Sequence, residues 1–193
     1  GQSVEWKEPM PFPSPGFAEL RMLEVSPAVA WRPSKKLSLG LALDLYAADL
    51  EIRQSFPWSS ITGPGTPDGR IRIDADGETL GASAGITWLP ANGHRVSVSW
   101  KKGVDLTVDG EIEVTRPVPL PLPPSVGAPS DFSSQMHFPD QVSGAWRMPL
   151  LPGLGLELGA EWLGWSSNDV QPLYAGANQS LLQTSALEQH WQD

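Results

Sequence analysis

The side chains in this sequence that could catalyse a reaction or bind a metal are carboxylates and three histidines. The carboxylates of interest interrupt largely apolar stretches: Asp44, Asp105, Glu157 and Glu161. Paired carboxylates can act as acid and base, but no nucleophile or partner base is identifiable beside them. His94, His137 and His190 are scattered, unlike the closely spaced histidines of a metal site. The sequence therefore predicts no catalytic residue, no metal site and no cofactor.

The charge pattern gives little sign of phosphate or nucleic-acid binding. The net charge is −9, whereas nucleic-acid binding requires a basic face. The segment GPGTPDG at 63–69 lacks the Gly-Lys-Ser/Thr ending of a phosphate-binding loop. Arg53, Lys101 and Lys102 are candidates to attract a carboxylate head group. The absence of cysteine excludes disulfides and thiolate metal sites.

The segment Arg95–Val114 has the clearest structural pattern in the chain. Apolar residues occupy even positions from Val96 to Val114, and polar residues occupy the odd ones, with exceptions at Lys102 and Gly110. Period-two alternation predicts an extended strand with one apolar face. Strands of soluble proteins usually run about 3–10 residues, so one of twice that length favours a membrane barrel with lipid outside and water inside. A long strand of a large soluble sandwich is the alternative.

Other stretches repeat this alternation. Leu37–Ala47 has an eleven-residue apolar face, and a membrane-spanning strand needs about 9–11 residues. The apolar parity changes after Ala48, which suggests a bulge near Ala47–Ala48. Pro27 marks an edge, bulge or bend, and Pro139 breaks a further strand. No run of about eighteen apolar residues is present, which excludes a membrane-spanning helix.

The connections between these strands alternate in length. Those at 33–36, 90–94 and 149–153 are short, while those at 54–70, 116–134 and 168–190 are long. Antiparallel strands place alternate connections at opposite ends, as in outer-membrane barrels with short periplasmic turns and long extracellular loops. Trp31, Trp88 and Trp146 each lie close to a short turn, which predicts a tryptophan belt at one membrane interface.

The predicted organisation is all-β, an antiparallel transmembrane β-barrel represented by about six to eight strands. Residues 1–17 are predicted to be a loop segment, 18–170 barrel strands, and 171–193 an extracellular loop with helical residues at 180–190. Lipid-facing side chains are expected along Leu37–Leu45, Val96–Val108 and Leu154–Leu158. The predicted lumen-lining residues are Asp44, Tyr46, Ser97, Ser99, Asp105, Thr107, Glu157 and Glu161. The predicted ligand contacts on the long loops are Met10, Phe12, Phe17, Phe56, Trp58, Phe132 and Phe138.

Three patches of the sequence resemble the long-chain fatty-acid outer-membrane transporter family, which includes FadL-type proteins and their toluene and xylene relatives. These are LEVSPAVAWRPSKKLSLGLAL, IDADGETLGASAGITWLPANGHRVSVSW, and ELGAEWLGWSS followed by HWQD. The resemblance covers residues 18–193. It implies a fourteen-stranded barrel with an N-terminal hatch, in the outer membrane of a Gram-negative bacterium, that conducts hydrophobic molecules by diffusion without an energy-coupling site.

The chain departs from that family pattern in ways that predict an internal fragment. The hatch, with its Asn-Pro-Ala-type motif, and the upstream strands are absent, and Gly1-Gln2-Ser3 lacks the features of a signal peptide. No ligand-release residue of the family is therefore carried over. The predicted protein is a monomer in outer-membrane lipid that takes a hydrophobic small molecule. The alternatives are an outer-membrane barrel with other cargo or an adhesive role, and a soluble β-sandwich binding domain.

Overall fold

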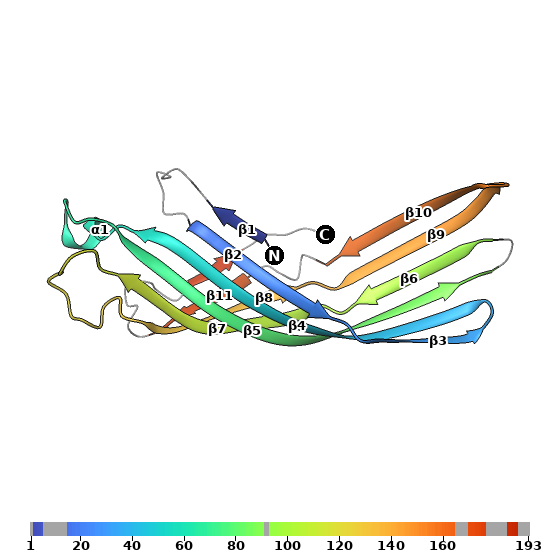
Figure 1. Cartoon of the computed structure of the whole chain (residues 1–193), viewed down its shortest axis with the longest axis horizontal. Helices are drawn as coiled ribbons and strands as arrows, with labels where there is room; N and C mark the ends of the chain where they lie inside the picture. Colours follow the sequence, from blue (N-terminus) through green and yellow to red (C-terminus); the bar gives the residue numbers. More distant parts are fainter. Residues whose placement is uncertain (1, 6–14, 91–92, 165–169, 177–184, 189–193) are drawn as a thin grey trace.

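The structure, a computed structural model, describes residues 2–5, 15–90, 93–164, 170–176 and 185–188. Its strands form one antiparallel sheet of twelve strands (Figure 1), as the alternation predicted. No helix among these residues is long and apolar enough to cross a membrane. The elements are β1 (Gln2–Glu5), β2 (Pro15–Val25), β3 (Ala28–Ser34), β4 (Leu37–Phe56), α1 (Ser59–Thr62), β5 (Gly69–Trp88), β6 (Arg95–Lys101), β7 (Val104–Thr115), β8 (Ser130–Phe138), β9 (Gln141–Leu151), β10 (Leu154–Leu163), β11 (Val170–Ala175) and β12 (Ser185–Glu188).

Two strands, β4 and β5, run the length of the sheet and join its two halves. One half has the order β3-β4-β5-β6-β9-β10 and ends in the short turns; we call it the turn half. The other has the order β1-β2-β4-β5-β7-β8-β11-β12 and ends in the long connections; we call it the loop half. The hairpins β3–β4 and β9–β10 lie at one end of the molecule, and α1 lies at the other (Figure 1). The β3–β4 and β9–β10 turns therefore lie at the opposite end from the long connection that carries α1, as predicted, while part of the predicted connection 168–190 lies outside the described residues.

On both sides of β4 and β5, breaks at one level separate the strands of the turn half from those of the loop half; we call this level the junction. It contains Pro27, Lys102–Gly103 and Pro139–Asp140, and Gly164 borders it. Backbone hydrogen bonds link these points across the sheet: Leu43 N donates to Pro27 O, Lys102 N to Ala82 O, and Gly164 N to Asp140 O, at 3.1, 2.9 and 3.0 Å. Because proline donates no backbone hydrogen bond, it interrupts a strand readily. The break predicted at Pro139 is confirmed, and Pro27, predicted to mark an edge, a bulge or a bend, lies between β2 and β3.

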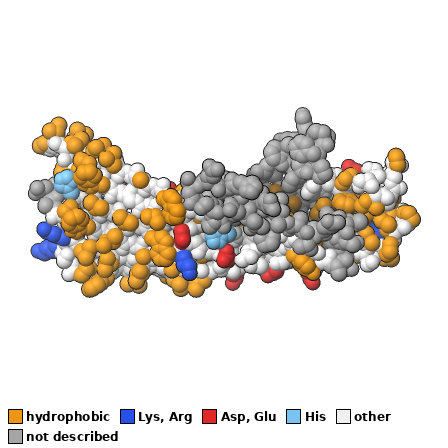
Figure 2. All heavy atoms as spheres, turned by 180° about the vertical axis from the view of Figure 1, so that it is seen from behind, with side chains coloured by type: hydrophobic (Ala, Val, Ile, Leu, Met, Phe, Trp, Pro, Cys, Tyr) orange, Lys and Arg blue, Asp and Glu red, His pale blue; other side chains and the backbone are white. Residues whose placement is uncertain are grey.

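The two faces of the sheet exchange their character at the junction. On the face that carries Leu41, which we call the outer face, the turn half is apolar: Leu41 and Leu80 are 68% and 57% exposed. The same face of the loop half carries charged side chains such as Asp49 and Asp76, which pair directly. The opposite, inner face has small and polar residues in the turn half and buried apolar residues in the loop half. Figure 2 shows hydrophobic side chains gathered over the half that carries the short turns.

The predicted bulge near Ala47–Ala48 is wrong. The pairing of β4 with β5 is unbroken from Leu37 opposite Trp88 to Phe56 opposite Gly69. The parity changes because the apolar side chains pass from the outer to the inner face along a strand in which no residue is inserted. Where the strand extends beyond the lipid, its outer face contacts water and becomes polar. Only its inner face can be apolar there.

The predicted continuous strand Arg95–Val114 is also wrong, because the junction divides it into β6 and β7. Ser83 pairs with Lys101 and Asp76 pairs with Asp109, so six residues of β5 (77–82) face seven residues of the other strand (102–108). This extra residue is a β-bulge, and a bulge changes which face the following residues occupy. Leu106 and Val108 are therefore buried on the inner face rather than directed to lipid.

The ends of the described chain differ from prediction as well. Gln2–Glu5 and Val170–Ala175 are strands where loops were predicted, and Ser185–Glu188 is a strand within the segment predicted to be helical. Each of these short strands pairs with a neighbour in the sheet. Strand pairing supplies hydrogen-bond partners for backbone groups that would otherwise bond to water. The local sequence does not show that such a pairing partner is available.

Gly103 at the bulge provides a test of the junction. A Cβ atom there would lie 2.6 Å from the Phe138 carbonyl oxygen and 2.8 Å from the Asp140 nitrogen, both backbone atoms. We expect Gly103→Ala to lower the free energy of unfolding by about 1–3 kcal/mol, the usual cost of overpacking. Gly40→Ala is the matched control, because nothing lies within 4 Å of its added Cβ. Urea unfolding in lipid vesicles, followed by tryptophan fluorescence, should show a loss for the first variant alone.

Candidate functional site

The inner face of the loop half carries a cluster of buried apolar side chains, which we call the apolar cluster. Leu106 and Val108 of β7 are fully buried, and Ile112 and Val114 are 3% and 2% exposed. The buried members from the rest of the sheet and its loops are Ala48, Phe56, Trp58, Ile71, Ala75 and Phe132. Leu20, Leu50 and Ile73 pack against them. These side chains are apolar, and none of them offers a group for chemical catalysis.

The long connections close over this cluster. Trp58, beside α1, is fully buried and donates its indole N–H to the Thr115 carbonyl at 3.0 Å. Its ring meets Phe56 edge-on at 4.9 Å between centroids. The Arg116 guanidinium donates to the carbonyls of Leu122, Pro123 and Val126, which shapes the loop after β7. Leu120, Leu122 and Val126 of that loop pack on the cluster. The cluster is therefore lined by strands and covered by loops.

A polar group lies beneath the apolar cluster, next to the junction. Lys101 of β6 donates to both carboxylate oxygens of Glu24 of β2, at 2.7 and 2.8 Å, although β4 and β5 lie between these strands. The Lys101 ammonium also lies 5.4 Å from the centre of the Tyr46 ring. Asp44 is 1% exposed and accepts a hydrogen bond from Ser83. We call the Lys101–Glu24 pair the junction bridge, because it crosses the inner face.

The junction bridge should contribute a measurable coupling energy. Both side chains are about a third exposed (31% and 36%), so water screens their attraction and the pair resembles a surface ion pair. In a double-mutant cycle with Lys101→Met and Glu24→Gln, we expect a coupling of about 0.5–1 kcal/mol in urea unfolding. The same cycle on Lys36 and Glu24 is the control, since these two make no contact. A coupling of zero for the bridge would contradict its formation in the membrane.

The predicted lumen-lining residues divide between the two faces. Strand pairing places Asp44, Tyr46, Ser97 and Ser99 on the inner face. Glu157 and Glu161 lie on the same face, because they pair with Arg147 and Ser143, which pair in turn with inner-face residues of β6. Asp105 and Thr107 lie on the outer face of the loop half, where Asp105 contacts His137 at 2.7 Å. The prediction that these two share a face with the other six is wrong, because it ignored the bulge at Lys102–Gly103.

The predicted ligand contacts also separate. Phe56, Trp58 and Phe132 belong to the apolar cluster, and Phe138 packs against it. Phe17 lies on the outer face, where the Arg53 guanidinium stacks 5.0 Å from its ring centre. Met10 and Phe12 lie outside the described residues. Sequence reasoning missed the main contributors, Leu106, Val108, Ile112 and Val114. The sequence did contain a signal: Asp109, Glu111 and Glu113 lie between these apolar residues. Carboxylates need water, so the face opposite Leu106 could not be the one sealed from solvent.

The predicted tryptophan belt lies on one face at one end of the sheet. Trp31, Trp88 and Trp146 are on the outer face of the turn half, and they are 64%, 50% and 43% exposed. Trp88 and Trp146 occupy the same cross-strand row, separated by Val96. Trp100 and Trp162 share this face in a further row through Val142. Such exposed indole rings suit a membrane interface.

The outer face of the loop half is suited to water. Arg21, Arg53 and Arg72 each pair with a carboxylate two residues away in the same strand. The hydrogen bond and charge of Asp74 raise the pKa of Arg72, and Glu19 does the same for Arg21. Carboxylates dominate the rest of this surface. Among the described residues, no three carboxylates or histidines are placed to hold a metal ion.

Comparison with known proteins identifies the family. The family described as "Outer membrane protein transport protein (OMPP1/FadL/TodX)" matches residues 14–193. No curated protein matches the chain. Among solved structures, a Pseudomonas aeruginosa FadL homologue is similar, with 15% identity, a TM-score of 0.70, and coverage of 91% of this chain and 44% of that one.

Two further solved structures share the fold. The Ralstonia pickettii toluene transporter TbuX has 17% identity and a TM-score of 0.60, with 91% of this chain and 49% of that chain covered. The CymD monoaromatic hydrocarbon channel has 14% identity and a TM-score of 0.61, with 93% and 56% covered. This chain therefore spans about half the length of these solved structures. The chain belongs to the outer membrane protein transport protein family (OMPP1/FadL/TodX), whose members lie in the outer membrane of Gram-negative bacteria.

Proposed function

We propose that this protein is a channel through which hydrophobic molecules, long-chain fatty acids or aromatic hydrocarbons, cross the outer membrane by passive diffusion. The observation that carries the proposal is the exchange of faces at the junction. In the turn half, apolar side chains cover the outer face, where lipid would lie. In the loop half they cover the inner face and form the apolar cluster.

This arrangement suits the capture of a molecule that is poorly soluble in water. The long-loop end faces the exterior in barrels of this kind, so the apolar cluster would lie directly beneath the loops that a hydrophobic molecule meets first. Its residues carry no charge, so the affinity for a cargo would come from burial of the cargo's apolar surface. Beyond the junction bridge the inner face becomes small and polar, with Ser97 and Ser99 on β6. Weaker binding there favours onward movement.

The names of two solved relatives support the cargo class. One is a toluene transporter and another a monoaromatic hydrocarbon channel. The third solved relative is a FadL homologue from Pseudomonas aeruginosa. We therefore retain both fatty acids and aromatic hydrocarbons in the proposal.

Uptake into proteoliposomes tests this function. Vesicles that contain the full-length protein should take up labelled oleate or toluene faster than empty vesicles, without an ion gradient or ATP. A hydrophilic solute of similar mass, such as labelled proline for toluene, should enter at the same rate in both. Equal entry of oleate and of toluene with and without the protein would overturn the proposal. A requirement for an imposed proton gradient would overturn the passive mode.

A further inference from the structure

A groove lies on the outer face at the point where its apolar band ends. The volume of the groove is about 540 Å³, within the range of about 300–1,000 Å³ that is usual for ligand sites. Leu23 and Val25 of β2, Leu45 of β4 and Leu80 of β5 line it, and all four side chains are exposed. The groove therefore offers an apolar surface to whatever surrounds the protein at this level.

The groove forms because a small side chain lies between longer ones. Ala47 of β4 pairs with Leu23 on one side and with Glu78 on the other, so it is the floor of the groove. At this level β4 is hydrogen-bonded to both β2 and β5, which carry the walls. The groove therefore lies within the sheet rather than at a free edge, on the face away from the interior.

A polar hollow of about 340 Å³ adjoins the groove on the side of the long connections. Its lining side chains come from the next two cross-strand rows: Arg21, Asp49 and Asp76 in the first, and Glu19, Glu51 and Asp74 in the second. Successive rows on one face are two residues apart, or about 7 Å. The apolar groove therefore leads directly into the polar hollow, as the chain and the head group of a lipid would require.

Three aspartates in and beside the hollow have no partner of opposite charge. Asp49 pairs directly with Asp76, and Asp76 pairs with Asp109. Like charges directly opposite each other destabilise a sheet. Among the described residues none of the three makes an ion pair or a side-chain hydrogen bond, and Arg21 in the same row is bound to Glu19 at 2.8 Å. A cation held between these carboxylates would remove the repulsion.

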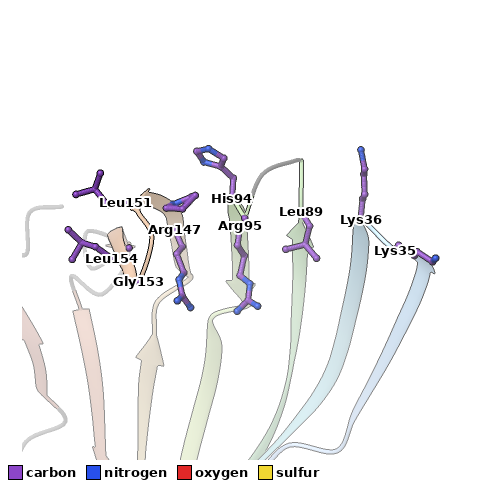
Figure 3. A pocket seen from close by; sticks show the side chains of 12 residues that line it. Lys35, Lys36, Leu89, His94, Arg95, Arg147, Leu151, Gly153 and Leu154 are labelled. Atoms are coloured by element: carbon purple, nitrogen blue, oxygen red, sulfur yellow. The ribbon is translucent and has the colours of Figure 1, made fainter.

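The cations of the short-turn end are too distant to balance this row. The side chains of Lys35, Lys36, Arg95 and Arg147 lie together at that end of the sheet (Figure 3). The apolar stretch Leu37–Ala47 of β4 separates them from Asp49. This stretch corresponds to roughly 35 Å along the strand, several times the screening length of about 8–10 Å in physiological salt. These cations therefore leave the charge of the aspartates in place.

The head group that suits the hollow carries a protonated amine. The aspartates would repel an anionic head, whereas an ammonium group provides N–H donors for charge-assisted hydrogen bonds to two carboxylates at once. Arg21, whose side chain is 68% exposed, can add a contact to a phosphate. A phosphate next to an ammonium group is the head of an ethanolamine phospholipid.

We propose that the groove and the hollow together bind an ethanolamine phospholipid of the surrounding membrane. An acyl chain lies over Ala47, between Leu23 and Leu80. The ammonium group donates to Asp49 and Asp76, and the phosphate accepts from Arg21. The groove is continuous with the lipid-facing surface of the turn half, which makes a membrane lipid its occupant. The site is on the outer face, apart from the apolar cluster, so it does not depend on the cargo of the channel.

The affinities for three phospholipids test the site. The full-length protein in detergent is titrated with dioleoyl phosphatidylethanolamine, phosphatidylcholine or phosphatidylglycerol, and native mass spectrometry measures the dissociation constant of the first bound lipid. We expect phosphatidylethanolamine to bind about tenfold more tightly than phosphatidylglycerol, because hydrogen bonds to charged groups are among the stronger ones. Phosphatidylcholine, which has the positive charge but no N–H donor, should be intermediate.

Two variants separate the contribution of the head group from that of the chain. Asp49→Asn/Asp76→Asn should weaken phosphatidylethanolamine binding by about tenfold and abolish its advantage over phosphatidylglycerol. Ala47→Phe fills the groove and should weaken the binding of all three lipids. Both changes are at exposed positions of the outer face, so the variants should still fold.

Each variant has a matched control on the same face. Glu111→Gln/Asp131→Asn removes the same charge from two directly paired residues of β7 and β8, farther from the groove. Ala84→Phe adds the same bulk opposite Leu41, on the lipid-facing surface of the turn half. Neither control should change the affinity for phosphatidylethanolamine.

Three results would overturn the proposal. Equal affinities of the wild-type protein for the three lipids would show that the aspartates do not select the head group. Phosphatidylethanolamine binding that neither Ala47→Phe nor Asp49→Asn/Asp76→Asn weakens would place the bound lipid elsewhere. Preferred binding of phosphatidylglycerol that requires Mg²⁺ and is lost with EDTA would identify an anionic head group bridged by a metal ion instead.

Discussion

Leu41→Arg is expected to lower the free energy of unfolding in lipid vesicles by about 2–4 kcal/mol, the cost of arginine on the lipid face near the bilayer midplane. Leu41 is central in the apolar stretch Leu37–Ala47 of β4, and it is 68% exposed on the outer face. Its cross-strand neighbours Val29 and Ala84 are apolar, so no carboxylate is adjacent to the new charge. Urea unfolding of the vesicle-inserted protein, followed by tryptophan fluorescence, measures the change.

The matched control is Asp109→Arg on the same outer face in the loop half. Asp109 is exposed and pairs with Asp76, so an arginine there gains an attractive neighbour. Exposed substitutions of this type usually change stability by no more than about 0.5 kcal/mol. Equal destabilisation by both variants would mean that the outer face is not divided into a lipid-facing half and a solvated half. The junction would then not mark a membrane boundary.

The strands and turns were predictable because their signals are local. Period-two alternation identifies Leu37–Ala47 or Leu154–Trp162 as strands without knowledge of their neighbours. Pro27 and Pro139 break strands through their own chemistry. The difference between short and long connections can be counted along the chain. Each of these predictions needed only adjacent residues, and the structure confirms them.

The assignment of faces needed information that the sequence pattern conceals. In β4 no residue is inserted, so the passage from lipid to water appears in the sequence as a change of apolar parity after Ala48. The predicted bulge near Ala47–Ala48 arose from that change of parity. A change of environment and a bulge produce the same pattern, and only the pairing with β5 distinguishes them.

The opposite error arose along Arg95–Val114. There the environment changes and a residue is also inserted, at Lys102–Gly103. The insertion reverses the faces, and the change of environment reverses which face is apolar. The two effects cancel in the sequence, so apolar residues stay on even positions from Val96 to Val114. A strand that appears continuous is therefore two strands with opposite orientation.

These two errors explain which parts of the candidate site were missed. Aromatic loop residues such as Trp58 and Phe132 were recognised by type, and they do lie in the apolar cluster. Leu106 and its neighbours on β7 were assigned to lipid, because their parity matched that of Val96 and Val98.

Leu106→Ala tests the revised face assignment, with an expected loss of about 2–4 kcal/mol in the free energy of unfolding. Leu106 is fully buried in the apolar cluster, and truncation of a buried leucine removes contacts and leaves a cavity. Thr107→Ala, its exposed neighbour on the outer face, should change stability by no more than about 0.5 kcal/mol.

A larger side chain makes this test specific to the inner face. A leucine that faced acyl chains or detergent tails could be enlarged, because the surrounding hydrocarbon is fluid. A leucine within the apolar cluster is packed against protein, so Leu106→Trp should also lower the free energy of unfolding, by about 1–3 kcal/mol, the usual cost of overpacking. Unchanged or higher stability of Leu106→Trp would return Leu106 to the lipid-facing surface. In that case the bulge at Lys102–Gly103 would not reverse the strand, and the apolar cluster would lose the residues of β7 that form its centre.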